Sequence, residues 1–337
     1  MITQQQYQQL VIATLNRCFG MMNDPEKYYY IQPCSIGDII KLGGYTRAFL
    51  DKVHKKSAVM IAQQRYEPIN IDFDGVSEIR YLNSTEMNFV AEYIHATKQY
   101  FGANFMFAGA PQGYVKPPNL NDMQIFKQIF KLPPDAPFYN PRVRDIPDDA
   151  KLRFSQQYVL NKEKTIIIAP RANTPMTPPS IVFWQNLIEN LRQKGYVIYT
   201  NIGKDVVGRV DNVLPNTSPL YANINEIFYL IDKVKCIIGV RSGLLDLLAF
   251  SKGNIICLSP SEWPHADLKL IYPDTPSKIC SLFFNWEFFP KLNELIAQFE
   301  IESMSVANVK HKKIAPENLF FDEQNLLAAV LRAVEAL

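Results

Sequence analysis

The sequence predicts an α/β protein of two domains, each built on a parallel β-sheet with helices on both faces. The chain has 337 residues, whereas one hydrophobic core rarely serves more than about 250–300. Short apolar runs alternate with helix-like segments, the order typical of βαβ units. These runs are continuously apolar, as strands are when helices cover both faces of a parallel sheet.

The N-terminal half opens with a strand, a turn of small residues and a helix. Residues 28–31 form an apolar run, Pro33 to Asp38 supply the turn, and 39–53 follow with helical spacing. The other elements expected in this half are strands at 58–62, 79–82 and 103–108 and a helix at 88–100.

A proline-rich stretch separates the two halves. Residues 133–147 contain five prolines, which can continue neither a helix nor a central strand. We therefore expect an N-terminal domain at 1–150 and a C-terminal domain at 151–315. The last segment, 316–337, contains a helix that we expect to pack back on the N-terminal domain.

The C-terminal half alternates strands and helices more regularly. Its first amphipathic helix is followed by Gly195, a residue favoured just after the last turn of a helix. The expected strands lie at 165–170, 196–200, 236–240 and 255–258, and the expected helices at 181–194, 225–233, 242–251 and 323–337.

Charge and cysteine content argue against several classes of protein. The 35 basic and 33 acidic residues leave a net charge of +2, so the chain lacks the positive field of a nucleic-acid-binding protein. None of the five cysteines forms a C-x-x-C pair, which argues against a disulfide framework or a zinc site. We expect no metal and no cofactor. Residues 1–20 lack the features of a signal peptide, and no window has the ~20 apolar residues of a membrane span. The expected location is the cytoplasm.

Residues that follow the strands are the candidates for ligand binding, because ligands of open parallel sheets bind beyond the carboxyl ends of the strands. After the strand at 236–240 come Arg241, Ser242, Gly243 and Asp246. Backbone N–H groups at such a helix start can hold a diphosphate, to which an arginine adds a fork of charged donors. Alternatively, Ser242 is only a helix cap and Gly243 only a tight turn. Neither a G-x-G-x-x-G nor a P-loop motif occurs, so dinucleotide redox chemistry and NTP hydrolysis lack their fingerprints.

Other strand ends add further candidates for binding a donor. Arg171 follows the strand at 165–170 and would neutralise a leaving phosphate, with Asn173 and Thr174 beside it as hydrogen-bonding groups. The alternative for Arg171 is a solvated loop residue. Gly203 follows the next strand. Glu226, at a helix start, would accept hydrogen bonds from a ribose or would simply complement the helix dipole.

The first turn of the chain and a late loop supply the remaining candidates. Asp38 is either a helix-start carboxylate or a general base toward a sugar hydroxyl. His265 lies in the loop after the strand at 255–258, where it contacts a phosphate or an acceptor, or is a surface residue.

These motifs resemble those of the lipopolysaccharide heptosyltransferases, glycosyltransferase family 9, which have the GT-B fold. Where that family has D-T-G-L-[SA]-H-L-A-A, residues 241–249 are R-S-G-L-L-D-L-L-A, and its G-P-T corresponds to Ser259-Pro260-Ser261. Its S-x-G-D-[IV] turn corresponds to residues 35–39. Arg241 replaces the motif's aspartate and Asp246 its histidine, and the family's basic residue is absent around 182–184, so we expect a donor sugar other than heptose.

The resemblance implies two Rossmann-like domains whose parallel sheets face a central cleft, and a function in lipopolysaccharide or other cell-surface polysaccharide synthesis. The enzyme would move a sugar from a nucleotide-sugar donor to a glycan or lipid-linked saccharide acceptor, with inversion and without metal. The base is Asp38, and Ser35, Gly37 and His265 contact the acceptor. An acceptor anchored in lipid would bring the protein to the inner membrane face. The alternatives are a nucleotide-sugar epimerase and a non-catalytic protein that binds glycans or nucleotides.

Overall fold

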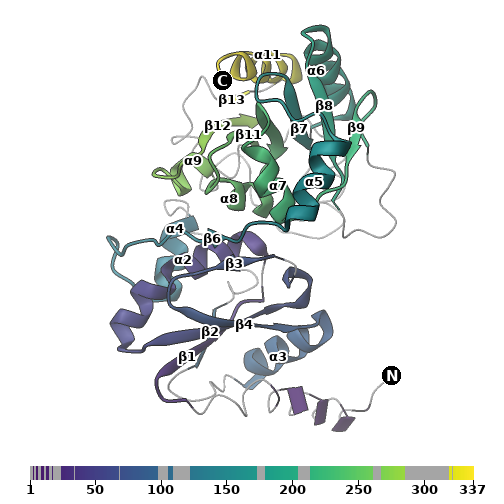
Figure 1. Ribbon diagram of the computed structural model, residues 1–337. Helices are drawn as coiled ribbons and strands as arrows, with labels where there is room; N and C mark the ends of the chain where they lie inside the picture. The colour runs from purple at the N-terminus through teal and green to yellow at the C-terminus, as the bar shows by residue number, and fades with distance from the viewer. Residues whose placement is uncertain are drawn as a thin grey trace. The chain divides into compact units, whose positions relative to one another are not determined.

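A computed structural model shows that the chain forms two compact units (Figure 1). The first unit comprises Met1–Lys116 and Met123–Arg144, and the second Pro117–Asp122 and Asp145–Leu337. The structure describes residues 3, 5–6, 9–10, 13–14, 17, 24–33, 35–67, 69–97, 105–108, 122–172, 179–203, 213–260, 267–284, 319–320 and 322–337.

The first unit contains a four-stranded sheet in which every strand pair is parallel. Its strand order is β4-β2-β1-β5, so β1 lies inside the sheet. The expected strands are present with small changes of bounds, and β3 and β6 form an additional antiparallel pair. The elements are β1 (Lys27–Ile31), α2 (Ile36–Val53), β2 (Ser57–Gln63), the 3₁₀ turn η1 (Gln64–Tyr66), β3 (Ile71–Asp72), β4 (Val76–Leu82), α3 (Ser84–Thr97), β5 (Phe105–Phe107), α4 (Asp122–Ile129) and β6 (Arg142–Val143).

Twelve of the 18 residues of helix α2 are buried, and aromatic rings pack closely against two of its glycines. A Cβ atom on Gly43 would lie 2.3 Å from the ring of Phe73, and one on Gly44 would lie 2.1 Å from the ring of Phe138. Two glycines weaken an isolated helix. Here the two glycines let the rings of Phe73 and Phe138 lie closer to the helix axis than they could if these positions carried a side chain.

The second unit contains a seven-stranded sheet, all parallel, within the described part of the chain. Its strand order is β13-β12-β11-β10-β7-β8-β9. The elements are α5 (Asp148–Gln157), β7 (Thr165–Ala169), α6 (Ile181–Gln193), β8 (Val197–Asn201), β9 (Ser218–Leu220), α7 (Ile224–Ile231), β10 (Cys236–Val240), α8 (Gly243–Leu248), β11 (Asn254–Pro260), α9 (Leu268–Ile271), β12 (Lys278–Phe284), β13 (Leu319–Phe320) and α11 (Glu323–Glu335).

Three strands of this sheet are not apparent in the sequence. β9 and β13 have three and two residues, too few for a periodic pattern, and β9 contains Pro219, which is tolerated because β9 is an edge strand. β12 pairs with β11 along its full length, but its polar Lys278 and Ser281 interrupt the apolar run.

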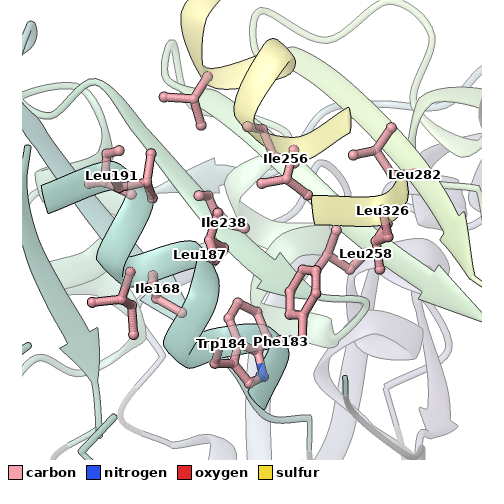
Figure 2. Packing of buried hydrophobic residues seen from close by; sticks show 14 of the residues in the cluster. Ile168, Phe183, Trp184, Leu187, Leu191, Ile238, Ile256, Leu258, Leu282 and Leu326 are labelled. Carbon is pink, nitrogen blue, oxygen red and sulfur yellow. The ribbon is translucent and has the colours of Figure 1, made fainter. Parts of the chain in front are cut away.

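A hydrophobic core lies on one face of the second sheet, and Figure 2 shows its packing. Phe183, Trp184 and Leu187 of α6 pack there against alternate residues of the strands, such as Ile168 and Ile238. Residues between them point to the opposite face, where Leu245 of α8 lies against Gly239. The sheet is therefore covered on both faces, which explains its continuously apolar strands.

The C-terminal helix α11 belongs to the second unit, and the expected contact with the N-terminal domain stays a prediction. Its residues Leu326, Val330 and Val334 are at most 2% exposed and lie in the same core as α6. Its apolar face is thus already buried within its own unit. Among the described residues, no helix combines the length and apolarity needed to cross a membrane.

Candidate functional site

The strand order of the second sheet marks the point where a ligand is expected to bind. From β7 the chain runs outward through β8 to β9, and then returns to place β10 on the other side of β7. Ligands of such sheets bind where the strand order reverses, beyond the carboxyl ends of the strands. Gly239 of β10 is in register with Ala169 of β7, so the segments that follow these two strands begin side by side.

Arg171 is the cation at the end of β7, two residues beyond Ala169, and it is exposed. It thus lies at the carboxyl edge of the sheet, and its contact with a donor phosphate stays a prediction. Asn173, Thr174 and His265, predicted to contact the donor or the acceptor, lie outside the described residues.

Arg241 and Asp246, at the end of β10 and in α8, form a buried ion pair that the sequence did not predict. Nη1 of Arg241 donates to Oδ2 of Asp246, and Nη2 donates to Oδ1, each at 2.8 Å. The two side chains are 6% and 3% exposed. Both were predicted to contact the donor. The structure directs them toward each other instead.

The ionisation of Arg241 follows from this pairing. Burial by itself would lower the pKa of the guanidinium, but the charge and hydrogen bonds of Asp246 outweigh burial and raise this pKa above its ordinary value. Arg241 therefore stays positively charged. Because the Asp246 carboxylate balances this charge, the pair as a whole would neutralise little of the charge of a phosphate.

Ser242 and Gly243 form the turn between β10 and α8, and both are half-buried. Ser242 has extended backbone angles, φ −159° and ψ 165°, and in the described structure its hydroxyl caps no backbone N–H of α8. This geometry disfavours the alternative that Ser242 is only a capping residue. Because α8 has six residues, its macrodipole is small, and any attraction for an anion would come from the unpaired N–H groups of its first turn.

Glu226 is engaged at the start of α7 and is 5% exposed. Its Oε2 accepts from the backbone N–H of Asn223 at 2.7 Å, and its own N–H donates to Oδ1 of Asn223 at 2.9 Å. Its Oε1 accepts from Nη2 of Arg153 at 2.5 Å. Both carboxylate oxygens thus accept hydrogen bonds from groups of the second unit, and a contact of Glu226 with a ribose stays a prediction. No sequence motif around Arg153 indicated its contact with Glu226.

Gly203 follows β8 and has a left-handed backbone, φ +71°, which favours glycine. Its N–H donates to Oδ1 of Asn201 at 3.2 Å. This turn ends β8 at the same edge of the sheet as Arg171.

The first sheet repeats the reversal of strand order, with β1 between β2 and β5. The turn after β1 carries Ser35, Gly37 and Asp38 to this position. Oδ2 of Asp38 accepts from the backbone N–H of Ser35 at 3.2 Å and from its hydroxyl at 3.0 Å. Asp38 is half-buried and Gly37 is buried. The carboxylate thus stabilises the start of α2, and both hydrogen bonds engage the same oxygen, Oδ2.

Lys41 is a residue near this turn that the sequence reasoning missed. It lies three residues after Asp38, is 3% exposed, and its Nζ lies 5.6 Å from the ring centroid of Phe126. Lysine is seldom buried so completely. The available signal was a lysine among the apolar residues of α2.

Comparison with solved structures supports the fold in both units. A glycosyl transferase family 9 protein from Veillonella parvula aligns over 93% of this chain and 98% of its own, with a TM-score of 0.59 and 11% identity. E. coli ADP-heptose LPS heptosyltransferase II aligns over 92% and 99%, with a TM-score of 0.54 and 12% identity. No protein-family model and no curated protein matches the sequence. The chain therefore has a heptosyltransferase-like GT-B fold, and the predicted α/β class is confirmed.

Proposed function

We propose that this protein is a glycosyltransferase that moves a sugar from a nucleotide-sugar donor to a glycan or lipid-linked acceptor. One observation carries the proposal. Both parallel sheets reverse their strand order beside their first strand, and the turns at these two points carry Asp38 in one unit and Ser242 in the other. Two solved structures with this fold are a glycosyl transferase of family 9 and an ADP-heptose LPS heptosyltransferase.

The donor would bind to the second unit, at the ends of β7 and β10. Arg171 supplies the exposed cation, and the turn at Ser242 and Gly243 supplies backbone N–H groups and a hydroxyl for the diphosphate. We assign no phosphate contact to Arg241, because its charge is already balanced by Asp246. Fixed donors of this kind stabilise a leaving diphosphate without a metal.

The acceptor would bind to the first unit, near Ser35, Gly37 and Asp38. The acceptor oxygen attacks the anomeric carbon of the donor sugar, and the carbon–oxygen bond to the diphosphate breaks. Asp38 takes the proton of the acceptor hydroxyl, and the nucleoside diphosphate leaves with the bonding electrons. A single displacement of this kind inverts the anomeric centre. Ser35 holds Oδ2 of Asp38, and we assign the proton transfer to Oδ1.

The first experiment identifies the donor by thermal shift with a panel of nucleoside diphosphates and nucleotide sugars. A ligand at 100 times its Kd stabilises the folded protein by about 2.7 kcal/mol. We expect at least one nucleotide sugar to raise the Tm and to release its diphosphate in the presence of an acceptor. Binding without any turnover would instead favour a non-catalytic protein, and turnover that needs no acceptor would favour an epimerase.

The second experiment separates the chemistry of Asp38 from its structural role. Asp38→Asn keeps a side-chain oxygen that can accept from Ser35 but removes the base, so transfer should fall about 10²- to 10⁴-fold with little change in Tm. Asp38→Ala also removes these hydrogen bonds and should lose about 1 kcal/mol of stability. The matched control is Asp51→Asn, an exposed carboxylate on the same helix that pairs with Arg47. Full turnover by Asp38→Asn would eliminate Asp38 as the base.

A further inference from the structure

Tyr221 is a large aromatic residue at the same edge of the second sheet as Arg171, and it is 46% exposed. It follows directly after Leu220, the last residue of β9, which is in register with Asn201, the last residue of β8. β8 pairs in turn with β7, and all three strands run parallel. Because the carboxyl ends of parallel strands share one edge of a sheet, Tyr221 lies at the edge where ligands of such sheets bind.

The backbone that carries this ring is held on two sides. The N–H of Tyr221 donates to the hydroxyl of Tyr158 at 3.2 Å. The carbonyl of Leu220, which belongs to the same peptide bond, accepts from the N–H of Ile202 at 3.2 Å. The ring of Tyr158 packs edge-on against that of Tyr199 in β8, with the ring centroids 5.4 Å apart. The peptide before Tyr221 is therefore fixed both to the end of β8 and to the residue that ends α5.

The positions of Arg171 and Tyr221 fit the two ends of a nucleoside diphosphate. Neighbouring strands lie about 4.8 Å apart, so the end of β9 lies about 10 Å from the end of β7 along the edge of the sheet. A diphosphate bound at Arg171 can therefore extend its ribose and base along this edge toward Tyr221. Between them lies Gly203, two residues beyond β8 as Arg171 is two residues beyond β7. Gly203 has no side chain that would stand in the way of a ribose.

We infer that the ring of Tyr221 stacks on the base of the donor nucleotide. This inference rests on the proposed nucleotide-sugar binding and adds the residue that binds the base. A nucleobase is flat and uncharged, and an aromatic ring stacks on purines and pyrimidines alike. Because the peptide of Tyr221 is already fixed in the free protein, the ring loses little conformational freedom when a base covers it. Covering a ring that is 46% exposed also removes apolar surface from water.

The test compares nucleoside diphosphates with inorganic pyrophosphate, which offers the diphosphate without a nucleoside. Titration calorimetry of the full chain with ADP, GDP, CDP, UDP, dTDP and pyrophosphate gives the ratio of the two affinities for each base. Tyr221→Ala removes the ring, Tyr221→Phe keeps it, and Tyr221→Leu keeps apolar bulk without a ring. The matched control is Tyr229→Ala, which removes a half-buried ring near the C-terminal end of α7, 4.5 Å from Nζ of Lys233.

For the nucleoside diphosphate that the wild-type chain binds most tightly, Tyr221→Ala should lower the ratio about tenfold, the effect of one lost base–aromatic contact, and leave the affinity for pyrophosphate unchanged. Tyr221→Phe and the control should keep the ratio, and Tyr221→Leu should lower it as alanine does. A wild-type ratio in Tyr221→Ala or Tyr221→Leu overturns the inference, and so does an equal loss of both affinities. The comparison of Tyr221→Phe with Tyr221→Leu carries the test if the alanine variant does not fold.

Two outcomes separate this inference from the proposed function. If the wild-type chain binds no nucleoside diphosphate more tightly than pyrophosphate, the proposed nucleotide site fails and the stacking role of Tyr221 fails with it. If the wild-type chain prefers a nucleoside diphosphate and Tyr221→Ala keeps that preference in full, the stacking role alone fails.

Discussion

Gly43 of helix α2 provides a direct test of the packing in the first unit. Helix propensity predicts that Gly43→Ala stabilises the protein, whereas the packing predicts that it destabilises it. Alanine normally stabilises a helix interior by about 1 kcal/mol relative to glycine. Here a Cβ atom would lie 2.3, 2.4 and 2.5 Å from Cδ1, Cε1 and Cγ of Phe73, a ring that is 4% exposed. All three distances are far below van der Waals contact, and the ring or the helix would have to move.

The expected magnitude follows from two opposing effects. Overpacking of a well-packed core costs about 1–3 kcal/mol, and the overlap with a buried ring places Gly43→Ala in the upper part of that range. After the gain in helix propensity, we expect a net loss of about 1–2 kcal/mol. In a Phe73→Ala background the ring is absent, and the same substitution should gain about 1 kcal/mol.

Urea unfolding with two probes assigns the effect to the correct unit. All three tryptophans, residues 184, 263 and 286, belong to the second unit, so their fluorescence reports that unit, whereas far-UV circular dichroism reports both. Gly43→Ala should lower the urea midpoint of the first unit. This shift should appear in the circular dichroism curve and be absent from the tryptophan fluorescence curve. Stabilisation by Gly43→Ala in the wild-type background, or the same effect in both backgrounds, would refute the reasoning.

Three further predictions concern the second unit. Arg171→Ala should weaken nucleoside diphosphate binding about tenfold and reduce its salt dependence, as titrations at two ionic strengths will show; unchanged affinity would exclude Arg171 from the phosphate site. Burial raises the pKa of the Cys236 thiol to about 12 and of Cys257 to about 11. Because the pKa of each thiol is higher in the folded than in the unfolded state, the stability that these thiols contribute is complete below pH 9 and is lost as pH rises toward 11–12. At pH 8 a thiol reagent should therefore label both cysteines only in urea. Leu187→Ala, at a fully buried position of α6, should lower the stability reported by tryptophan fluorescence by about 2–5 kcal/mol, and a change below 1 kcal/mol would contradict the packing in Figure 2.

The candidate residues of each unit were partly predictable, because they lie just after strands that the sequence marks. Arg171, Ser242 and Asp38 each follow an apolar strand, and carboxyl ends of parallel strands share one edge of a sheet. The partners of charged residues were not predictable in this way. Arg241 and Asp246 are five residues apart across a strand–helix junction, a separation that corresponds to no regular helical or strand spacing.

Local pattern determined most of the longer strands and helices of this protein, since apolar periodicity and the residues at helix ends act over a few neighbours, but it did not mark β9, β12 or β13. Only the tertiary structure decided the order of strands within each sheet, the burial of α11 in the second unit, and the pairing of Arg241 with Asp246. These features depend on contacts between segments distant along the chain or across a change of secondary structure, and such contacts arise only when the sheets are packed.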